Sequence, residues 1–183
     1  DLLVPVLEGL AAVHEKGIVH RDLKPDNIFL ADTPGGEVVK LVDFGLARMD
    51  DGEGAPALTQ TSAVSGTPDY MSPEQCRSLK VGPETDIYAI GCILTVCLQL
   101  YPPFAGGSVV EVLTRQMFTA PPPLDRPASA APGPAALEQL RLDLLAKKAS
   151  ARPASALEVK QRLLEVFDAQ SHERRSTSRR VEQ

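Results

Sequence analysis

The sequence is short of the features that mark membrane, secreted and nucleic-acid-binding proteins. Its longest apolar run, Ile87 to Leu100, is interrupted by Gln99 and is too short to span a bilayer. No basic segment followed by an apolar one opens the chain, so we expect no signal peptide. Acidic residues outnumber basic ones, 24 to 19, which leaves no basic field to attract nucleic acid. We therefore expect a cytoplasmic protein with no membrane segment and no nucleic-acid partner.

Cysteine is also scarce. The three cysteines, Cys76, Cys92 and Cys97, do not have the spacing of metal ligands, and nothing indicates a secreted protein. We expect free thiols in a reducing compartment. What the chain does have is apolar content: 183 residues, 43% of them hydrophobic, can bury one sizeable core.

One dense run of polar residues stands out against these absences. Residues 20–27 read His-Arg-Asp-Leu-Lys-Pro-Asp-Asn, and an Asp-Phe-Gly triplet begins at Asp43, sixteen residues after Asn27. Seven fixed positions would match by chance about once in a billion placements at average residue usage. These residue types suit phosphoryl transfer, in which positioning and charge stabilisation do most of the catalytic work. The pattern therefore predicts an enzyme that uses ATP and Mg²⁺.

Four side chains divide this chemistry. Asp22 would accept the proton of the substrate hydroxyl, and Lys24 would place a positive charge where negative charge develops on the phosphoryl group. Asn27 and Asp43 would supply the hard oxygen ligands that Mg²⁺ prefers. A polar turn beside a proline is the alternative for each residue taken singly, but that alternative does not explain the triplet at Asp43.

With these motifs the chain resembles the C-terminal lobe of a Hanks-type serine/threonine protein kinase, closest to the eukaryotic-like kinases of bacteria. The resemblance runs from Asp1 to about Phe167. Lys24 follows the serine/threonine-specific pattern, and residues 66–74 resemble the end of the family's activation segment, with Ser72 where alanine is more usual. The resemblance implies a protein substrate with serine or threonine hydroxyls. It also implies a protein-kinase-like α+β fold, mainly helical, with a small β-hairpin at the catalytic site.

The resemblance assigns roles to residues outside the catalytic run. Thr67 lies where serine/threonine members contact the catalytic aspartate and lysine from the docking loop. Arg152 matches an arginine that pairs with the glutamate corresponding to Glu74, although a lone arginine would ordinarily be a solvated surface charge. Asp86 matches an aspartate that holds the backbone of the catalytic loop, with an ordinary helix N-cap as the alternative.

Residues 46–65 have little apolar content before Val64 and are expected to form a regulatory loop. Arg21 and Arg48 flank the catalytic motifs and could converge on one anion. A phosphate on Thr59 or Thr61 would supply the charge and acceptor oxygens that order a loop against arginines. Ser62 and Ser65 are further candidate acceptors, and the alternative partners of the two arginines are Asp50, Asp51 and Glu53.

Hydrophobic periodicity and turn signals predict the secondary structure. Apolar residues at helical spacing that end at Gly17 predict a helix from the N-terminus to about Lys16. Two short apolar runs should pair as a hairpin across a turn at residues 32–36 and so bring Asn27 and Asp43 together. The two strands are expected at 28–30 and 38–42, and further helices at 86–100, 109–118, 135–148 and 156–169.

Capping and composition set the remaining boundaries. Ser108 and Ser155 each precede a glutamate by three residues, which predicts capping boxes at the starts of two helices. Six prolines make residues 121–134 irregular. We assign residues 1–168 to the kinase lobe and residues 169–183 to a basic tail without regular structure.

The sequence lacks the motifs with which a kinase binds the adenine and the α- and β-phosphates of ATP. It lacks a glycine-rich Gly-x-Gly-x-x-Gly pattern and a Val-Ala-x-Lys strand. We therefore expect the N-terminal lobe to be absent and to be a required partner, the chain being a catalytic-lobe fragment that is active once completed. The alternative is a non-catalytic interaction fragment or pseudokinase-like module. Small-molecule phosphotransferases of related fold fit less well, because they lack a segment like residues 66–74.

Overall fold

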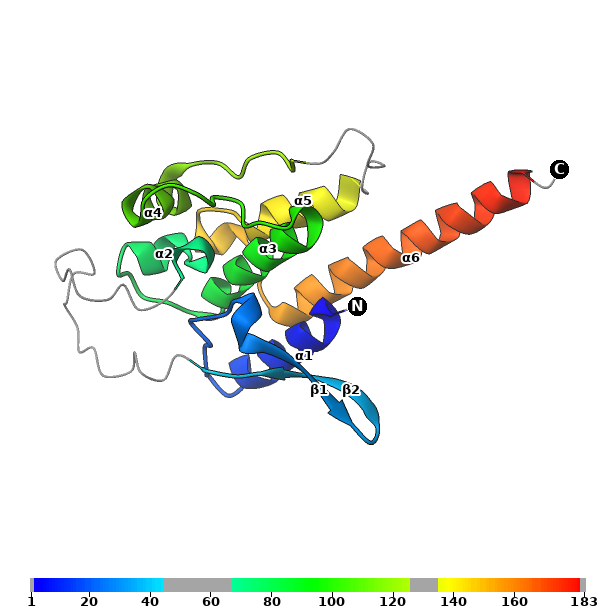
Figure 1. Cartoon of the computed structure of the whole chain (residues 1–183), viewed down its shortest axis with the longest axis horizontal. Helices are drawn as coiled ribbons and strands as arrows, with labels where there is room; N and C mark the ends of the chain where they lie inside the picture. The colour runs from blue at the N-terminus through cyan, green and yellow to red at the C-terminus, as the bar shows by residue number, and fades with distance from the viewer. Residues whose placement is uncertain (1, 45–66, 126–134, 182–183) are drawn as a thin grey trace.

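Helices make up most of the computed structural model, which describes residues 2–44, 67–125 and 135–181, with side chains described as far as residue 169 (Figure 1). The longer helices are α1 (Leu3–His14), α3 (Pro83–Gln99), α4 (Val109–Phe118), α5 (Ala135–Leu144) and α6 (Ala156–Val181). Shorter ones are η1 (Pro25–Asn27), η3 (Pro68–Tyr70), α2 (Pro73–Cys76) and η4 (Ala149–Ala151). No helix in these ranges is both long enough and apolar enough to cross a membrane.

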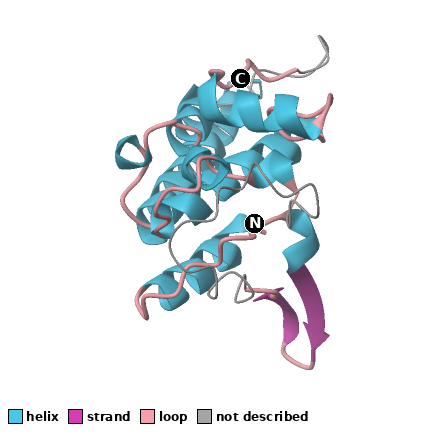
Figure 2. Cartoon of the chain, turned by 90° about the vertical axis from the view of Figure 1, so that its left-hand side faces the viewer, coloured by secondary structure: helices cyan, strands magenta, loops and turns pink. Residues whose placement is uncertain are grey.

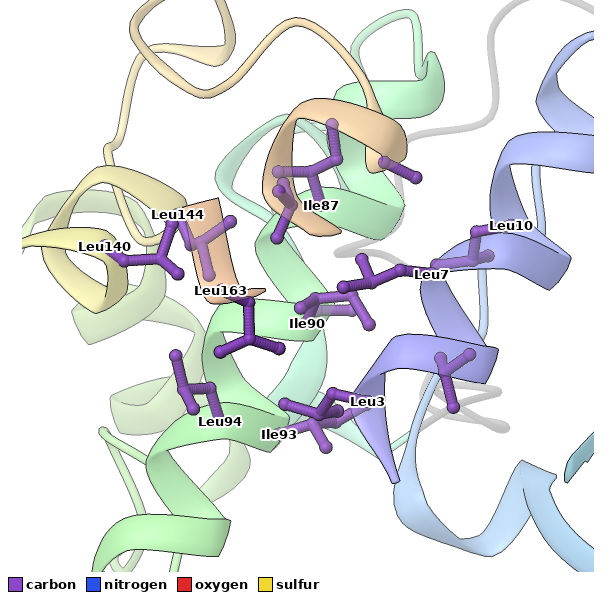
Figure 3. Close-up of a cluster of buried hydrophobic side chains, with 14 of the residues drawn as sticks. Leu3, Leu7, Leu10, Ile87, Ile90, Ile93, Leu94, Leu140, Leu144 and Leu163 are labelled. Carbon is purple, nitrogen blue, oxygen red and sulfur yellow. The ribbon is translucent and has the colours of Figure 1, made fainter. Parts of the chain in front are cut away.

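The hydrophobic core forms around α3. Side chains from α1, α5 and α6 meet it from different directions, as the close-up of the core shows (Figure 3). Leu7 of α1, Ile87 of α3 and Leu144 of α5 have no exposed surface. Gly91 allows the closest approach, because a Cβ atom there would lie 2.9 Å from the Cβ of Leu144. The core therefore fixes the distance between α3 and α5, and Pro83 at the first turn fixes where α3 begins.

Two antiparallel strands, β1 (Ile28–Thr33) and β2 (Gly36–Leu41), form the predicted hairpin, which projects from the helical body (Figure 2). Its register pairs Ile28 with Leu41 and Thr33 with Gly36. Gly36 has a φ of 108°, a conformation that favours glycine, and so closes the turn. Leu41 lies against Gly9 of α1, which anchors the inner end of the hairpin beside the core.

The differences from the sequence predictions lie at the ends of strands and helices. Both strands reach further into the turn than residues 28–30 and 38–42, and α3 begins at Pro83 rather than at residue 86. The helix predicted over 135–148 ends at Leu144, because the amide of Ala146 bonds to the carbonyl of Asp143 and the chain then turns into η4. The helix predicted to end at residue 169 continues to Val181 as α6. Residues 169–183 were predicted to be a basic tail without regular structure, whereas the backbone is helical as far as Val181. No proline or glycine lies between residues 156 and 181, so nothing stops helix propagation, which adds one hydrogen bond per residue.

Candidate active site

Asp22 is the centre of the loop that joins α1 to the hairpin. The Nζ atom of Lys24 lies 3.3 Å from Oδ2 of Asp22, and the Nδ2 group of Asn27 donates to the same oxygen at 3.3 Å and to the Asp22 carbonyl at 2.8 Å. Asn27 is buried, whereas 29% of the Asp22 side chain is exposed. Among the described residues both side-chain contacts fall on Oδ2, and none falls on Oδ1.

The base of the hairpin brings the second motif to this loop. The Val42 amide donates to the Asn27 carbonyl at 3.1 Å, and Nε2 of His20 lies 3.0 Å from the Val42 carbonyl. A carbonyl only accepts, so His20 must carry its proton on Nε2. The Phe44 ring also lies 4.6 Å from the His20 ring, between centroids. Asp43 is thereby held from both sides at the end of β2 nearest Asn27, in a left-handed conformation with φ 53°.

The donor atoms at this end of the hairpin fit Mg²⁺. Asn27 uses its amide nitrogen on Asp22, so its amide oxygen is the atom that remains for a cation. Together with the exposed carboxylate of Asp43 it offers two hard oxygen donors, and Mg²⁺ commonly takes one or two protein donors with phosphate oxygens and water. Within the described ranges no cluster of three or more His, Cys, Asp or Glu side chains could hold a metal. The set therefore suits an ion that arrives with a nucleotide.

Asp86 of α3 holds the backbone of the loop that contains Asp22. It is 1% exposed, and its two carboxylate oxygens accept the amides of His20 at 2.8 Å and Arg21 at 2.9 Å, with Nε2 of His14 at 2.7 Å. Arg21 has a φ of 68°, which is uncommon for a residue other than glycine and needs such support. The N-cap of α3 is Gly82, so the alternative reading of Asp86 as an N-cap is wrong.

Glu74 and Arg152 form a two-point ion pair beneath the end of the activation segment. The distances are 2.7 Å from Nη1 to Oε1 and 2.8 Å from Nη2 to Oε2, and both residues are buried. Thr85 also donates to Oε1 of Glu74 at 2.8 Å. Burial alone would raise the pKa of Glu74, but the hydrogen bonds and charge of Arg152 outweigh it and lower that pKa to about 2. The pair is therefore ionised at neutral pH.

Thr67 and Asp22 line one small pocket together with Tyr70 and Gln75. Gln75 completes a capping box with Ser72 and donates from Nε2 to the Arg21 carbonyl at 2.6 Å. The sequence analysis missed Gln75, although the Ser-x-x-Gln spacing was a usable signal. The contacts of His14 with Asp86 and of His20 with Val42 were not predicted either, although His20 belongs to the His-Arg-Asp motif. Of the proposed regulatory residues, Arg48, Thr59 and Thr61 lie outside the described residues.

Comparison with known proteins agrees with this geometry. The protein kinase domain family matches residues 1–165. The chain is 41% identical over 170 residues to the serine/threonine-protein kinase pkn2 of Myxococcus xanthus, covering 93% of this chain and 20% of that protein. It is 40% identical to pkn3 of the same organism, covering 82% and 28%, and 36% identical to PknB of Mycobacterium tuberculosis, covering 94% and 27%.

This chain belongs to the protein kinase family, and the relatives that it matches are serine/threonine-protein kinases. It spans 20% to 28% of the length of these three relatives.

Proposed function

We propose that this chain is the catalytic and substrate-binding part of a serine/threonine protein kinase, which transfers the γ-phosphoryl group of ATP to hydroxyls of a protein substrate. The observation that carries the proposal is the arrangement of Asp22, with Lys24 and Asn27 on one carboxylate oxygen and Asp43 held at the adjacent hairpin end. A purely structural cluster of buried charges would not leave the Asp22 carboxylate partly exposed.

The residues divide the reaction as follows. The substrate hydroxyl oxygen forms a bond to the γ-phosphorus while the bond from that phosphorus to ADP breaks, and the hydroxyl proton passes to Asp22. Lys24 offsets the negative charge that develops on the transferred group. Asn27 and Asp43 would hold Mg²⁺, which when bound neutralises charge on the phosphates. Thr67, in the pocket it shares with Asp22, would contact the acceptor side.

The proposal includes a partner. The sequence has no glycine-rich loop or strand lysine to hold the adenine and the α- and β-phosphates, so an N-terminal kinase lobe must supply those groups. The competing function is a non-catalytic interaction module that retains the kinase fold.

The test compares the 183-residue chain with the same chain joined to a kinase N-terminal lobe, using labelled ATP, Mg²⁺ and a basic protein as acceptor. We expect no appreciable transfer by the chain alone and clear transfer by the joined protein. Asp22→Asn should reduce the transfer rate by about 10² to 10⁴. A joined protein that binds ATP but shows no Asp22-dependent transfer would favour the non-catalytic module. Strong transfer by the chain alone would remove the need for the lobe.

Control by phosphorylation is the second part of the proposal. Asp86 holds the Arg21 amide and Gln75 holds the Arg21 carbonyl, so the residue before the catalytic base is fixed on both sides. A phosphate on Thr59 or Thr61 that binds Arg21 and Arg48 would thus act beside Asp22. In the joined protein we expect phosphatase treatment, or Thr59→Ala with Thr61→Ala, to lower activity. Full activity of the dephosphorylated double variant would exclude these two threonines as the switch.

A further inference from the structure

A chain of polar groups runs through the interior from the connection after α5 to the segment Thr67–Tyr70. Nζ of Lys147 donates to the Tyr88 hydroxyl at 3.1 Å and to the Gln116 carbonyl at 2.8 Å. The Tyr88 hydroxyl donates to Oε1 of Gln116 at 2.5 Å. Nε2 of Gln116 then donates to the carbonyls of Pro68 at 3.2 Å and Asp69 at 2.7 Å. Tyr88 and Gln116 have no exposed surface.

The direction of these bonds is fixed by the groups at the two ends. The carbonyls of Pro68 and Asp69 can only accept, so the amide nitrogen of Gln116 must face them. Its amide oxygen must then face Tyr88, which donates its single hydroxyl proton to that oxygen. The Tyr88 oxygen therefore accepts from Lys147, whose ammonium group has only donors. Every group is satisfied in one arrangement and in no other.

The segment at the end of this chain needs outside support. Its own backbone bonds are those of one three-residue turn, from Tyr70 to Thr67 and from Met71 to Pro68, each 3.2 Å long. A single turn of this kind is not stable alone, because one or two bonds do not offset the ordering of its residues. Gln116 supplies two further bonds from a rigid helix. The same segment lines the Asp22 pocket through Thr67 and Tyr70, so its position decides how an acceptor can approach the base.

We propose that Gln116 is a positioning residue for the acceptor-binding segment Thr67–Tyr70, and that Tyr88 and Lys147 fix its orientation. Through it, α4 would set the affinity of the kinase for its protein acceptor while leaving nucleotide binding unaffected. This role rests on the proposed kinase function, because only an acceptor substrate would use the segment.

Two variants and one control isolate the role. Gln116→Leu keeps the side-chain bulk but removes the side-chain donor from the carbonyls of Pro68 and Asp69, of which the Pro68 carbonyl still accepts the Met71 amide. Tyr88→Phe keeps the ring, over which Lys147 and Arg152 both lie, and removes only the hydroxyl. Val112→Ala removes buried volume one turn earlier in the same helix and leaves the hydrogen bonds of Gln116 in place, and so reports general destabilisation of α4.

The first measurement is amide hydrogen exchange on the 183-residue chain. In Gln116→Leu we expect the amides of Tyr70 and Met71 to exchange about tenfold faster than in the unaltered chain, relative to amides in the middle of α3. Val112→Ala should speed exchange in α4 without that selective change. Equal acceleration of all amides, or the same pattern in Val112→Ala, would overturn the proposal.

The second measurement is steady-state kinetics of the chain joined to an N-terminal lobe. We expect Gln116→Leu to raise the KM for a peptide acceptor about tenfold and Tyr88→Phe to raise it about threefold, with the KM for ATP within twofold. An unchanged peptide KM would overturn the role in acceptor binding. If the unaltered joined protein transfers no phosphate, the kinase function fails instead, and the exchange result still decides whether Gln116 positions the segment.

Discussion

Asp22 lies in the loop whose backbone Asp86 holds, and the two carboxylates have different surroundings. Asp86 is almost fully buried, and its carboxylate accepts two backbone amides and contacts a histidine. Asp22 is partly exposed, and its side-chain contacts with Lys24 and Asn27 gather on one oxygen. Three contacts occupy the buried carboxylate of Asp86, whereas Oδ1 of the partly exposed Asp22 has no side-chain contact among the described residues. The difference separates a carboxylate that positions the loop from the one that we propose accepts the substrate proton.

Glu74 and Arg152, like Asp86, are buried and fully engaged with partners. We expect the largest loss of stability when either is replaced. Replacing either residue with alanine leaves an unpaired buried charge and should lower the free energy of unfolding by about 3 to 5 kcal/mol. The exposed pair of Glu8 and Lys160 provides the control, since Glu8→Ala should lower it by only about 0 to 1 kcal/mol. Denaturant midpoints measure both. Near-neutral Glu74→Ala and Arg152→Ala variants would show that the pair does not support the fold.

The two aspartates themselves give the next test. Asp86→Ala leaves the amides of His20 and Arg21 without an acceptor and should lower the free energy of unfolding by about 2 to 4 kcal/mol. Asp22→Asn keeps the shape of an exposed side chain and should change it by less than about 0.5 kcal/mol. Urea unfolding of the two variants measures the difference. Equal losses in both would remove the distinction between the positioning and the reacting carboxylate.

Acid should lower the stability that the buried pair of Glu74 and Arg152 contributes. The pKa of Glu74 is about 2 in the folded protein against 4.5 ordinarily, so between these values the unfolded chain binds more protons than the folded one. The stability that this group contributes is complete above pH 4.5 and is lost as the pH falls toward 2. The effect should be smaller than that of Glu74→Ala, because a protonated glutamate keeps its volume. Unfolding free energies measured across this range should fall less steeply in Glu74→Gln, and an unchanged slope would contradict the assignment.

Gln75 connects the start of α2, at Ser72, with the catalytic loop, at Arg21. We expect the smallest loss of stability from its replacement. Gln75→Glu retains an oxygen for the Ser72 amide but loses the donor to the Arg21 carbonyl. We expect a loss of about 1 kcal/mol in stability, measured by thermal unfolding, because one hydrogen bond is removed. Gln75→Leu, which also removes the acceptor of the Ser72 amide, should lose more. A glutamate variant as unstable as the leucine variant would place the contribution in the Arg21 contact alone.

Local patterns predicted the parts of this molecule that local forces determine. The hairpin and the bounds of α4 are confirmed, because strand alternation, turn residues and the Ser108 capping box act over a few residues. The second box is only half present: Ser155 accepts from the Glu158 amide, but Glu158 accepts from Ala154 rather than from Ser155. Capping chemistry therefore located both helix starts but not every bond.

The rest depends on residues far apart in the sequence. His14 meets Asp86 across 72 positions, and Gln75 meets Arg21 across 54, so no spacing within one helix or loop could indicate either contact. The same holds for the bonds of Gln116 to Pro68 and Asp69. The end of α5 was misplaced for a related reason. Residues after Leu144 have helical propensity, yet the chain leaves the helix to bring Lys147 and Arg152 to their buried partners.

Gly91, whose side chain is a single hydrogen atom, affects residues far from it in the structure. Any larger residue would push α5 away from α3, because its Cβ would overlap Leu144 and Leu145. The chain that leaves α5 carries Lys147 and then Arg152, so a displacement there would reach Tyr88 and Glu74. Gly91 therefore helps to set where Lys147 and Arg152 lie, and through them the contacts with Gln116 and Glu74. A mutation that adds one methyl group at this crossing, without touching any polar residue, would change those contacts through the spacing of two helices.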